Sequence, residues 1–289
     1  MKDIFGNTVE EKLNNSLRER YKEIPVSIFD TTRIEWINKK RKWYELGIKS
    51  ELGRDNDLLG FSKTLNDFQG GDKNKKSISI FDPIVCELMY SWYCKDRGSI
   101  LDPFSGGGVR GIVAHHLGYK YTGIDLSENQ INANRYNAID ILPINNQPNW
   151  YNGDSEKLLN DFKSNFDMIF SCPPYSFLEK YSNHEDDLSN MTYEKFIIKY
   201  NSIIQKSCSL LKEKSFAIFV VGEVRDKKGW YLDFIGDTKR AFMNCGLKFH
   251  SEIILKNNIG SACIRIPGTF DRNRKITKIH QNILIFYKE

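Results

Sequence analysis

Alternation between short apolar segments and helical segments constrains the fold of this 289-residue chain more than any other feature. The sequence predicts strands and intervening helices throughout its second and third thirds, with few long gaps. The expected strands are 99–102, 121–125, 167–172, 216–223, 249–255 and 281–288, and the expected helices are 83–94, 108–118, 127–140, 194–211 and 234–246. Such alternation is typical of an α/β protein with a doubly wound, mostly parallel sheet. Because no helix is predicted between the last two strands, we expect them to form an antiparallel pair at one edge.

Composition argues against several classes of protein. The longest apolar runs, such as FAIFVV, have the length of a strand and not of a membrane span, and the first residues do not form a secretory signal. The six cysteines include no Cys-x-x-Cys pair, which argues against a disulfide framework and against structural zinc. We therefore expect a cytoplasmic protein with reduced thiols, no membrane association and no metal.

Positive charge is concentrated in two segments, although the net charge of the whole chain is only +5. Residues 31–49 hold six lysines and arginines against two glutamates, and these alternate with Trp36, Trp43 and Tyr44 on an expected helix. Residues 256–280 hold six lysines and arginines against one aspartate. Such clusters favour a polyanionic partner, and an equally ordinary explanation is a solvated surface.

Polar side chains follow four of the expected strands at the points where these strands end. They are Asp102, Asp125, Cys172 and Glu223. Binding sites of doubly wound sheets lie at the carboxyl ends of the strands, next to the point where the strand order reverses. The sequence therefore predicts one site that these four residues share.

The segment LDPFSGGGVRG at 101–111 predicts a strand, a glycine-rich turn and the start of a helix. Gly106, Gly108 and Gly111 match the Gly-x-Gly-x-x-Gly pattern of dinucleotide sites, with Asp125 on the next strand, and a plain tight turn would explain the same glycines. The fingerprint requires glycine directly after the strand, whereas here Asp-Pro-Phe-Ser intervenes, so a nicotinamide cofactor is disfavoured.

S-adenosyl-L-methionine suits this turn better. Asp102 would face its ammonium group, the glycines would let the backbone approach closely, and Asp125 would accept hydrogen bonds from both ribose hydroxyls. Asp154, in the later Gly-Asp pair, would lie at the adenine edge or would instead cap the short segment that follows it.

With CPPY at 172–175, these motifs complete a family pattern. DPFSGGG, GID, GD and CPPY together resemble the motifs of the DNA amino-methyltransferases, which methylate adenine N6 or cytosine N4. Within this family, the whole sequence most resembles phage or prophage DNA methylases. The resemblance implies a Rossmann-like methyltransferase fold, S-adenosyl-L-methionine as the cofactor and catalysis on a base flipped out of double-stranded DNA. The implied catalytic residues are Cys172, Pro173, Pro174 and Tyr175. The implied cofactor-binding residues are Phe81, Asp82, Pro83, Asp102, Pro103, Phe104, Gly106, Gly107, Asp125, Leu126 and Asp154.

The Pro-Pro corner suits an exocyclic amine, whose lone pair is delocalised into the ring of the base. Hydrogen bonds accepted from its two N–H groups would free that lone pair, and the fixed carbonyl of Pro173 would accept one of them. The base would stack on Tyr175. Cys172 departs from the family pattern, which has Asp, Asn or Ser there, because a thiol is a weak acceptor. Adenine N6 is favoured over cytosine N4.

For DNA contacts we expect the basic residues Lys39, Lys40, Arg41, Lys42, Arg225, Lys228, Arg272, Arg274 and Lys275. Residues 1–76 would form a basic N-terminal extension that recognises DNA, and residues 77–289 would form the catalytic domain. Three alternatives stay open: an RNA base methyltransferase that uses the same corner, a nucleic-acid-binding module without catalysis, and a nicotinamide enzyme. The sequence does not indicate an oligomeric state.

Overall fold

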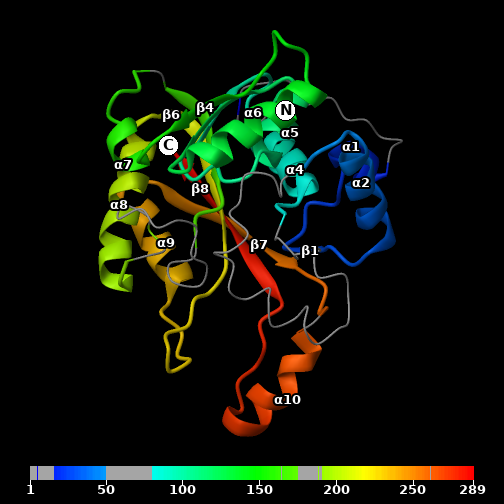
Figure 1. Ribbon diagram of the computed structural model, residues 1–289, viewed down its shortest axis with the longest axis vertical. Helices are drawn as coiled ribbons and strands as arrows, with labels where there is room; N and C mark the ends of the chain where they lie inside the picture. Colours follow the sequence, from blue (N-terminus) through cyan, green and yellow to red (C-terminus); the bar gives the residue numbers. More distant parts are fainter. Residues whose placement is uncertain are drawn as a thin grey trace.

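A single eight-stranded sheet forms the centre of the computed structural model, which describes residues 5, 16–49, 80–163, 165–174, 188, 191–260 and 262–289. The strands lie in the order β1-β7-β8-β6-β5-β2-β3-β4 (Figure 1). Their bounds are β1 Ile28–Asp30, β2 Ser99–Asp102, β3 Lys120–Asp125, β4 Asn149–Asn152, β5 Phe166–Ser171, β6 Leu211–Val221, β7 Lys248–Lys256 and β8 His280–Lys288. All neighbours pair in parallel except β8, which is antiparallel to both β6 and β7. The predicted doubly wound, mostly parallel sheet is confirmed.

The strand order reverses between β2 and β5. The chain runs from β2 outward through β3 to β4, and then returns to place β5 on the other side of β2. In such sheets the loops that follow the two central strands diverge to opposite faces and leave a crevice between them. The carboxyl ends of β2 and β5, at Asp102 and Ser171, therefore form the natural position for a ligand site.

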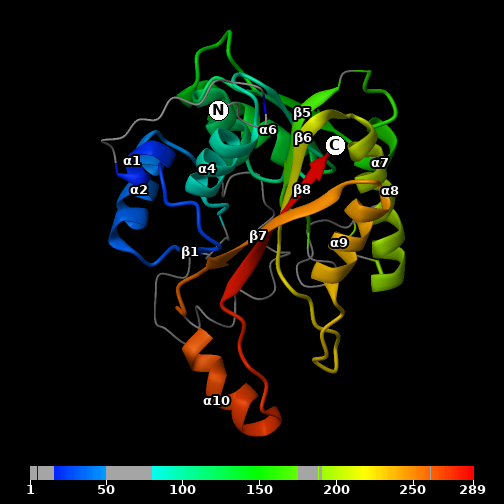
Figure 2. The same ribbon diagram turned by 180° about the vertical axis from the view of Figure 1, so that it is seen from behind.

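Helices cover both faces of the sheet, as Figures 1 and 2 show from opposite sides. One face packs against α2 (Ile34–Glu45), α4 (Pro83–Tyr93), α5 (Val109–His116) and α6 (Glu128–Ile141), and the other against α7 (Ser155–Leu158), α8 (Tyr193–Ser209) and α9 (Phe234–Asn244). Alternate residues of one strand point to opposite faces: in β5, Met168 and Phe170 join the first core and Ile169 joins the second. None of the described helices is long and apolar enough to cross a membrane.

Capping residues fix where several helices begin. Asp82 accepts a hydrogen bond from the backbone N–H of Ile84 (3.0 Å), and Pro83 follows as the first residue of α4. Ser127 caps α6 in the same way, as the sequence predicts, and Asp154 caps α7. The alternative role considered for Asp154, that of a helix cap, is therefore present in the fold.

The edge of the sheet differs from the prediction. The last two strands do pair antiparallel, but β8 lies between β6 and β7, and α10 (Ala262–Asn273) connects β7 to β8. The edge strand is β1, which pairs in parallel with β7. β1 has three residues, which is too short to show a period in the sequence, and the segment Asn149–Asn152 of β4 is not an apolar run of the kind that predicts β2.

The described part of the N-terminal segment packs as part of the same core. Besides β1, it contributes α1 (Leu17–Tyr21) and α2, and the side chains of Phe29, Trp36 and Trp43 are buried in the first core. The indole N–H of Trp36 donates to the Asp82 carboxylate (3.0 Å). The division into residues 1–76 and 77–289 stays a prediction, because its boundary lies outside the described residues, but β1 and α2 are built into the sheet domain.

We expect Trp36→Ala to lower the free energy of unfolding by about 3–5 kcal/mol, the usual cost of truncating a buried aromatic ring. The variant removes the packing between α2 and the core and also the hydrogen bond to Asp82. Urea unfolding followed by circular dichroism measures the change. Tyr136→Ala is the control, because that ring is 73% exposed on α6 and its loss should change stability by less than about 0.5 kcal/mol. Equal effects of the two variants would contradict the packing role of Trp36.

Candidate functional site

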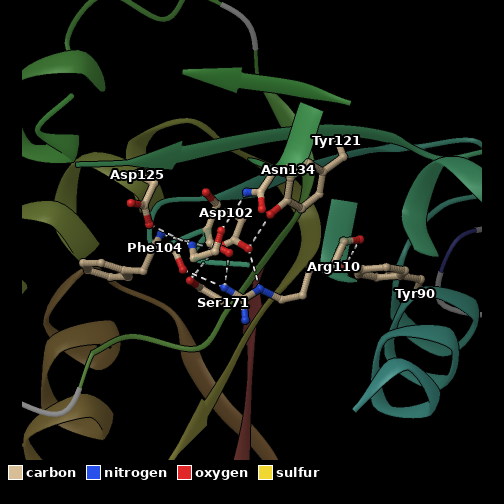
Figure 3. Close-up of polar contacts among 10 residues, drawn as sticks. Tyr90, Asp102, Phe104, Arg110, Tyr121, Asp125, Asn134 and Ser171 are labelled. Atoms are coloured by element: carbon tan, nitrogen blue, oxygen red, sulfur yellow. Dashed lines mark hydrogen bonds and ion pairs between the residues drawn. The ribbon is translucent and has the colours of Figure 1, made fainter. Parts of the chain in front are cut away.

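The carboxylate of Asp102 organises the crevice at the end of β2. Its Oδ2 accepts hydrogen bonds from Arg110 Nε (2.6 Å) and from the Tyr121 hydroxyl (2.6 Å). Its Oδ1 accepts from the Ser171 hydroxyl (2.5 Å) and from the backbone N–H of Phe104 (3.2 Å). Figure 3 shows these partners converging from β3, α5, the glycine loop and the end of β5. One carboxylate therefore connects both central strands of the sheet.

Arg110 extends this network into the glycine loop. Its Nη2 donates to the carbonyls of Phe104 (2.6 Å) and Ser105 (2.9 Å), and its guanidinium lies 4.8 Å from the centre of the Phe81 ring. Burial opposes the charge of Arg110, but the nearby carboxylate of Asp102 outweighs it and raises the pKa of the guanidinium above its ordinary value. The side chain stays charged and holds the turn between β2 and α5 in one conformation.

Two carboxylates predicted to contact the cofactor are occupied by groups of the protein, and their contact with a cofactor stays a prediction. Asp102 is fully buried and its carboxylate is engaged by four groups of the protein, so it does not face an open site. Asp82 is likewise buried, where it caps α4, accepts from Trp36 and forms an ion pair with Lys40 (3.1 Å). The sequence predicted that both carboxylates bind the cofactor, whereas the partners observed in the structure are other groups of the protein.

The backbone at Gly106 is bordered by free space, so a ligand could approach it closely. Gly106 has φ +47°, and a Cβ built there would meet nothing within 4 Å, so the turn faces open space. Its N–H donates to Asp125 Oδ2 (2.9 Å) and its carbonyl accepts from Asn134 of α6 (2.7 Å). Asp125 itself is half-buried at the end of β3. An open glycine turn beside a partly exposed carboxylate fits the ribose end of S-adenosylmethionine.

The other predicted cofactor residues line this same edge. Pro103 presents its carbonyl to the Ser155 hydroxyl (2.6 Å), and Phe104 stacks on Tyr200 with ring centres 5.9 Å apart. The Leu126 carbonyl accepts from Asn152 (3.0 Å), and Asp154 forms an ion pair with Lys199 (3.0 Å). Phe81 packs against the first core, Pro83 is buried inside α4, and Gly107 is half-buried in the glycine loop. Their contacts with a cofactor stay a prediction.

The Cys-Pro-Pro corner follows directly after β5. Cys172 is half-buried against the first core, Pro173 is buried and Pro174 is half-buried. The residue before them, Ser171, donates a hydrogen bond to Asp102, so the start of the corner is connected to the end of β2. Tyr175 lies outside the described residues, and its predicted stacking role stays a prediction.

The basic residues predicted to contact nucleic acid lie on α2, in the segment after β6 and around the end of α10. On α2, Lys39 donates to the Lys22 carbonyl and Lys40 pairs with Asp82, whereas Arg41 and Lys42 are exposed. The residues after β6 and after α10 do come together: Lys275 donates to the Lys228 carbonyl (2.9 Å), and Arg225 donates to the Ile276 carbonyl (3.4 Å). Arg272 and Arg274 are exposed nearby in sequence.

Sequence reasoning missed four residues that shape the site. They are Arg110, Tyr121, Asn134 and Ser171, and each contacts Asp102 or the glycine loop. Only Arg110 has a local signal, since it is the second residue of α5 and directly follows the turn that it holds. Among the described residues, no group of three or more His, Cys, Asp and Glu side chains could hold a metal ion.

Comparison with known proteins points to methyltransferases. A family model for RNA cap guanine-N2 methyltransferase matches residues 97–220. The solved structure of TrmN from Thermus thermophilus is 14% identical with a TM-score of 0.50, over 72% of this chain and 49% of that one, so this chain spans about half of that protein. Magnesium protoporphyrin IX methyltransferase (ChlM) from Synechocystis PCC 6803 with bound SAH is 13% identical with a TM-score of 0.48, over 87% of this chain and 94% of that one. No curated protein matches the chain.

The Rossmann-like fold, together with a family match over part of the chain, supports a methyltransferase that uses S-adenosylmethionine. The predictions of S-adenosylmethionine as the cofactor and of a Rossmann-like fold are confirmed. The alternative of a nicotinamide enzyme is not supported. The identification as a DNA amino-methyltransferase of the phage type is wrong, because the family model that matches the glycine loop, Asp125 and the Cys-Pro-Pro corner is one of RNA guanine methylation. Double-stranded DNA, DNA methylation and base flipping are left without support.

We expect Asp102→Asn to lower the free energy of unfolding by about 3–5 kcal/mol, because it leaves the buried charge of Arg110 without a counter-charge. Chemical denaturation measures this change. The double variant Asp102→Asn/Arg110→Met should be less destabilised than the two single losses together, since it contains no unpaired buried charge. Additive losses would contradict the coupling of this ion pair.

Proposed function

We propose that this protein transfers a methyl group from S-adenosylmethionine to the exocyclic N2 amino group of a guanine in RNA. The observation that carries the proposal is the match of the RNA cap guanine-N2 methyltransferase model to residues 97–220. This range contains the open glycine turn, Asp125 and the Cys-Pro-Pro corner, which are the parts of the crevice that a cofactor and a base would share.

The chemistry of guanine N2 suits the corner after β5. The N2 lone pair is delocalised into the purine ring, so the amine is a poor nucleophile until its N–H groups are held by acceptors. Pro173 has no N–H of its own and a fixed φ, so its carbonyl would accept one of these hydrogen bonds from a constant direction. Ser171, at the end of β5, donates a hydrogen bond to Asp102, and this bond would hold the start of the corner, and with it the Pro173 carbonyl, in position. The residues thus orient the amine toward the incoming methyl group.

On the cofactor side, Asp125 and the turn at Gly106 would hold the ribose and the chain attached to it. Bound S-adenosylmethionine supplies a methyl group on a positively charged sulfur; its C–S bond breaks as the N–C bond to guanine forms, and one N2 proton leaves to solvent. Asp102 and Arg110 touch neither partner in this scheme: they keep the turn and the corner at a constant separation.

The direct test is methyl transfer to RNA, analysed by mass spectrometry of the nucleosides. Purified protein and S-adenosylmethionine carrying a labelled methyl group would be incubated with capped RNA, with the same RNA uncapped, and with a matched DNA. We expect labelled N2-methylguanosine in at least one RNA and no label in the DNA. Label on adenine or cytosine, or label in the DNA alone, would contradict the proposal. The capped and uncapped arms separate a cap guanine from an internal one.

Cys172 gives a second prediction. A hydroxyl accepts hydrogen bonds better than a thiol of similar size, so Cys172→Ser should raise kcat by up to about fivefold, which corresponds to one added hydrogen bond of about 1 kcal/mol. Cys172→Ala, the matched control, should leave kcat near or below that of the native protein, and both should leave the Kd for S-adenosylmethionine unchanged. Steady-state kinetics and calorimetry measure these constants. A Cys172→Ser variant slower than Cys172→Ala would show that the thiol packs and does not accept.

A further inference from the structure

A short hairpin follows β6 at the carboxyl edge of the sheet. Leu232 N–H donates to the Val224 carbonyl (2.9 Å), and Asp226 N–H donates to the Trp230 carbonyl (2.8 Å). The Asp226 carboxylate accepts from the Trp230 N–H (2.8 Å), and Gly229 closes the turn with φ +84°. Sequence reasoning leaves this segment open between a solvated turn and a functional loop. Its backbone bonds make it an ordered hairpin, which we call the 224–232 hairpin.

The segment after α10 packs against this hairpin. Lys275 donates to the Lys228 carbonyl (2.9 Å) and its ammonium group lies 5.5 Å from the centre of the Trp230 ring. A Cβ built at Gly229 would lie 2.1 Å from Lys275 Nζ, so a larger residue there would displace this ammonium group from its present position. Arg225 lies 3.6 Å from the centre of the Tyr231 ring. Two segments distant in sequence therefore form one surface of alternating rings and cations.

This surface is exposed although it is aromatic. Trp230 is 68% exposed and Tyr231 is 48% exposed, whereas Trp36, Trp43 and Trp150 are buried. In Figures 1 and 2 the hairpin (yellow) and α10 (orange) both project beyond the sheet on the side where β6 and β7 end. Single exposed apolar residues are ordinary, whereas two exposed rings set among cations on one ordered hairpin form a candidate binding surface.

We propose that the 224–232 hairpin and residues 270–276 form a platform for single-stranded RNA, on which a base stacks against Trp230 while the neighbouring cations contact phosphates. Rings interleaved with Lys and Arg match a nucleic-acid strand, because every base has a face that stacks and every linkage carries a negative charge. The platform takes the strand that flanks the target guanine, and this assignment rests on the function proposed above.

Charge favours RNA over a protein partner. The hairpin contributes Arg225, Lys227 and Lys228 against Asp226, and residues 270–276 contribute Arg272, Arg274 and Lys275 against Asp271. Asp226 is also occupied within the hairpin, where it accepts from Trp230. The surface is therefore strongly positive, as required for phosphate contacts.

The position of the platform suits a strand that enters the crevice. β5 and β6 are parallel neighbours, with Ser171 opposite Phe219, so the Cys-Pro-Pro corner and the start of the hairpin leave the sheet at the same edge. The hairpin is anchored there by Glu223, whose carboxylate accepts from the backbone N–H groups of Val224 (3.3 Å) and Phe234 (2.7 Å). RNA held by Trp230 would thus reach the site from the edge at which the proposed chemistry occurs.

The test is direct binding of a fluorescein-labelled twelve-nucleotide single-stranded RNA, measured by anisotropy without S-adenosylmethionine. We expect Trp230→Ala to weaken binding by about 5- to 150-fold, the range for loss of one base–aromatic stack. Trp230→Phe, which keeps a ring face, should recover most of the affinity. Lys275→Met should weaken binding and reduce the dependence on salt concentration, because it removes a phosphate contact. Tyr136→Ala, an exposed ring on α6, is the matched control and should bind as the native protein does.

Several results would overturn the platform. One is a native protein that does not bind the RNA, and another is a Trp230→Ala variant that binds it as the native protein does. A third is a change in oligomeric state, seen by sedimentation, in place of a change in RNA affinity, which would make the surface a protein interface. Failure of the proposed function is separate: it would appear as RNA binding through Trp230 without transfer of a methyl group to guanine. Thermal melts of all variants exclude unfolding as the cause.

Discussion

The buried ion pair between Asp102 and Arg110 is the interaction on which the candidate site depends. An arginine and a carboxylate removed from water are costly unless hydrogen bonds compensate them, and here six hydrogen bonds within the protein engage the pair. The partners come from the end of β2, the glycine loop, β3 and the end of β5. Breaking the pair would release the turn and the corner together.

The candidate cofactor-binding, catalytic and RNA-binding features all lie at the same edge of the sheet. The glycine turn follows β2, Asp125 ends β3, the Cys-Pro-Pro corner follows β5, and the 224–232 hairpin follows β6. Parallel strands make this unavoidable, because their carboxyl ends all meet at one edge. The loop after β7 also emerges there, since β7 runs parallel to β6 on the far side of β8. A methyltransferase core and a basic aromatic surface thus become neighbours through topology alone.

Much of this could be predicted from the sequence, and the failures have physical causes. The α/β alternation, the glycine turn and the Pro-Pro corner are local patterns set by backbone geometry, and they were read correctly as elements. The substrate could not be predicted in this way. A Pro-Pro corner can accept hydrogen bonds from the exocyclic amine of adenine, cytosine or guanine, so the motif does not distinguish between these bases. The family model, which compares the whole range 97–220, corrected that reading. β1 escaped prediction because three residues show no period.

The sequence by itself determined the doubly wound fold and the identity of the residues at the strand ends, since both follow from periodicity and turn chemistry along the chain. Only the tertiary structure decided what those residues face. It turned Asp102 and Asp82 inward to Arg110, Tyr121, Trp36 and Lys40, left Asp125 partly exposed, and brought Lys275 onto Trp230. The physical reason is that the partner of a buried charge, or the cover of an exposed ring, comes from segments far away in sequence, and local pattern carries no information about their approach.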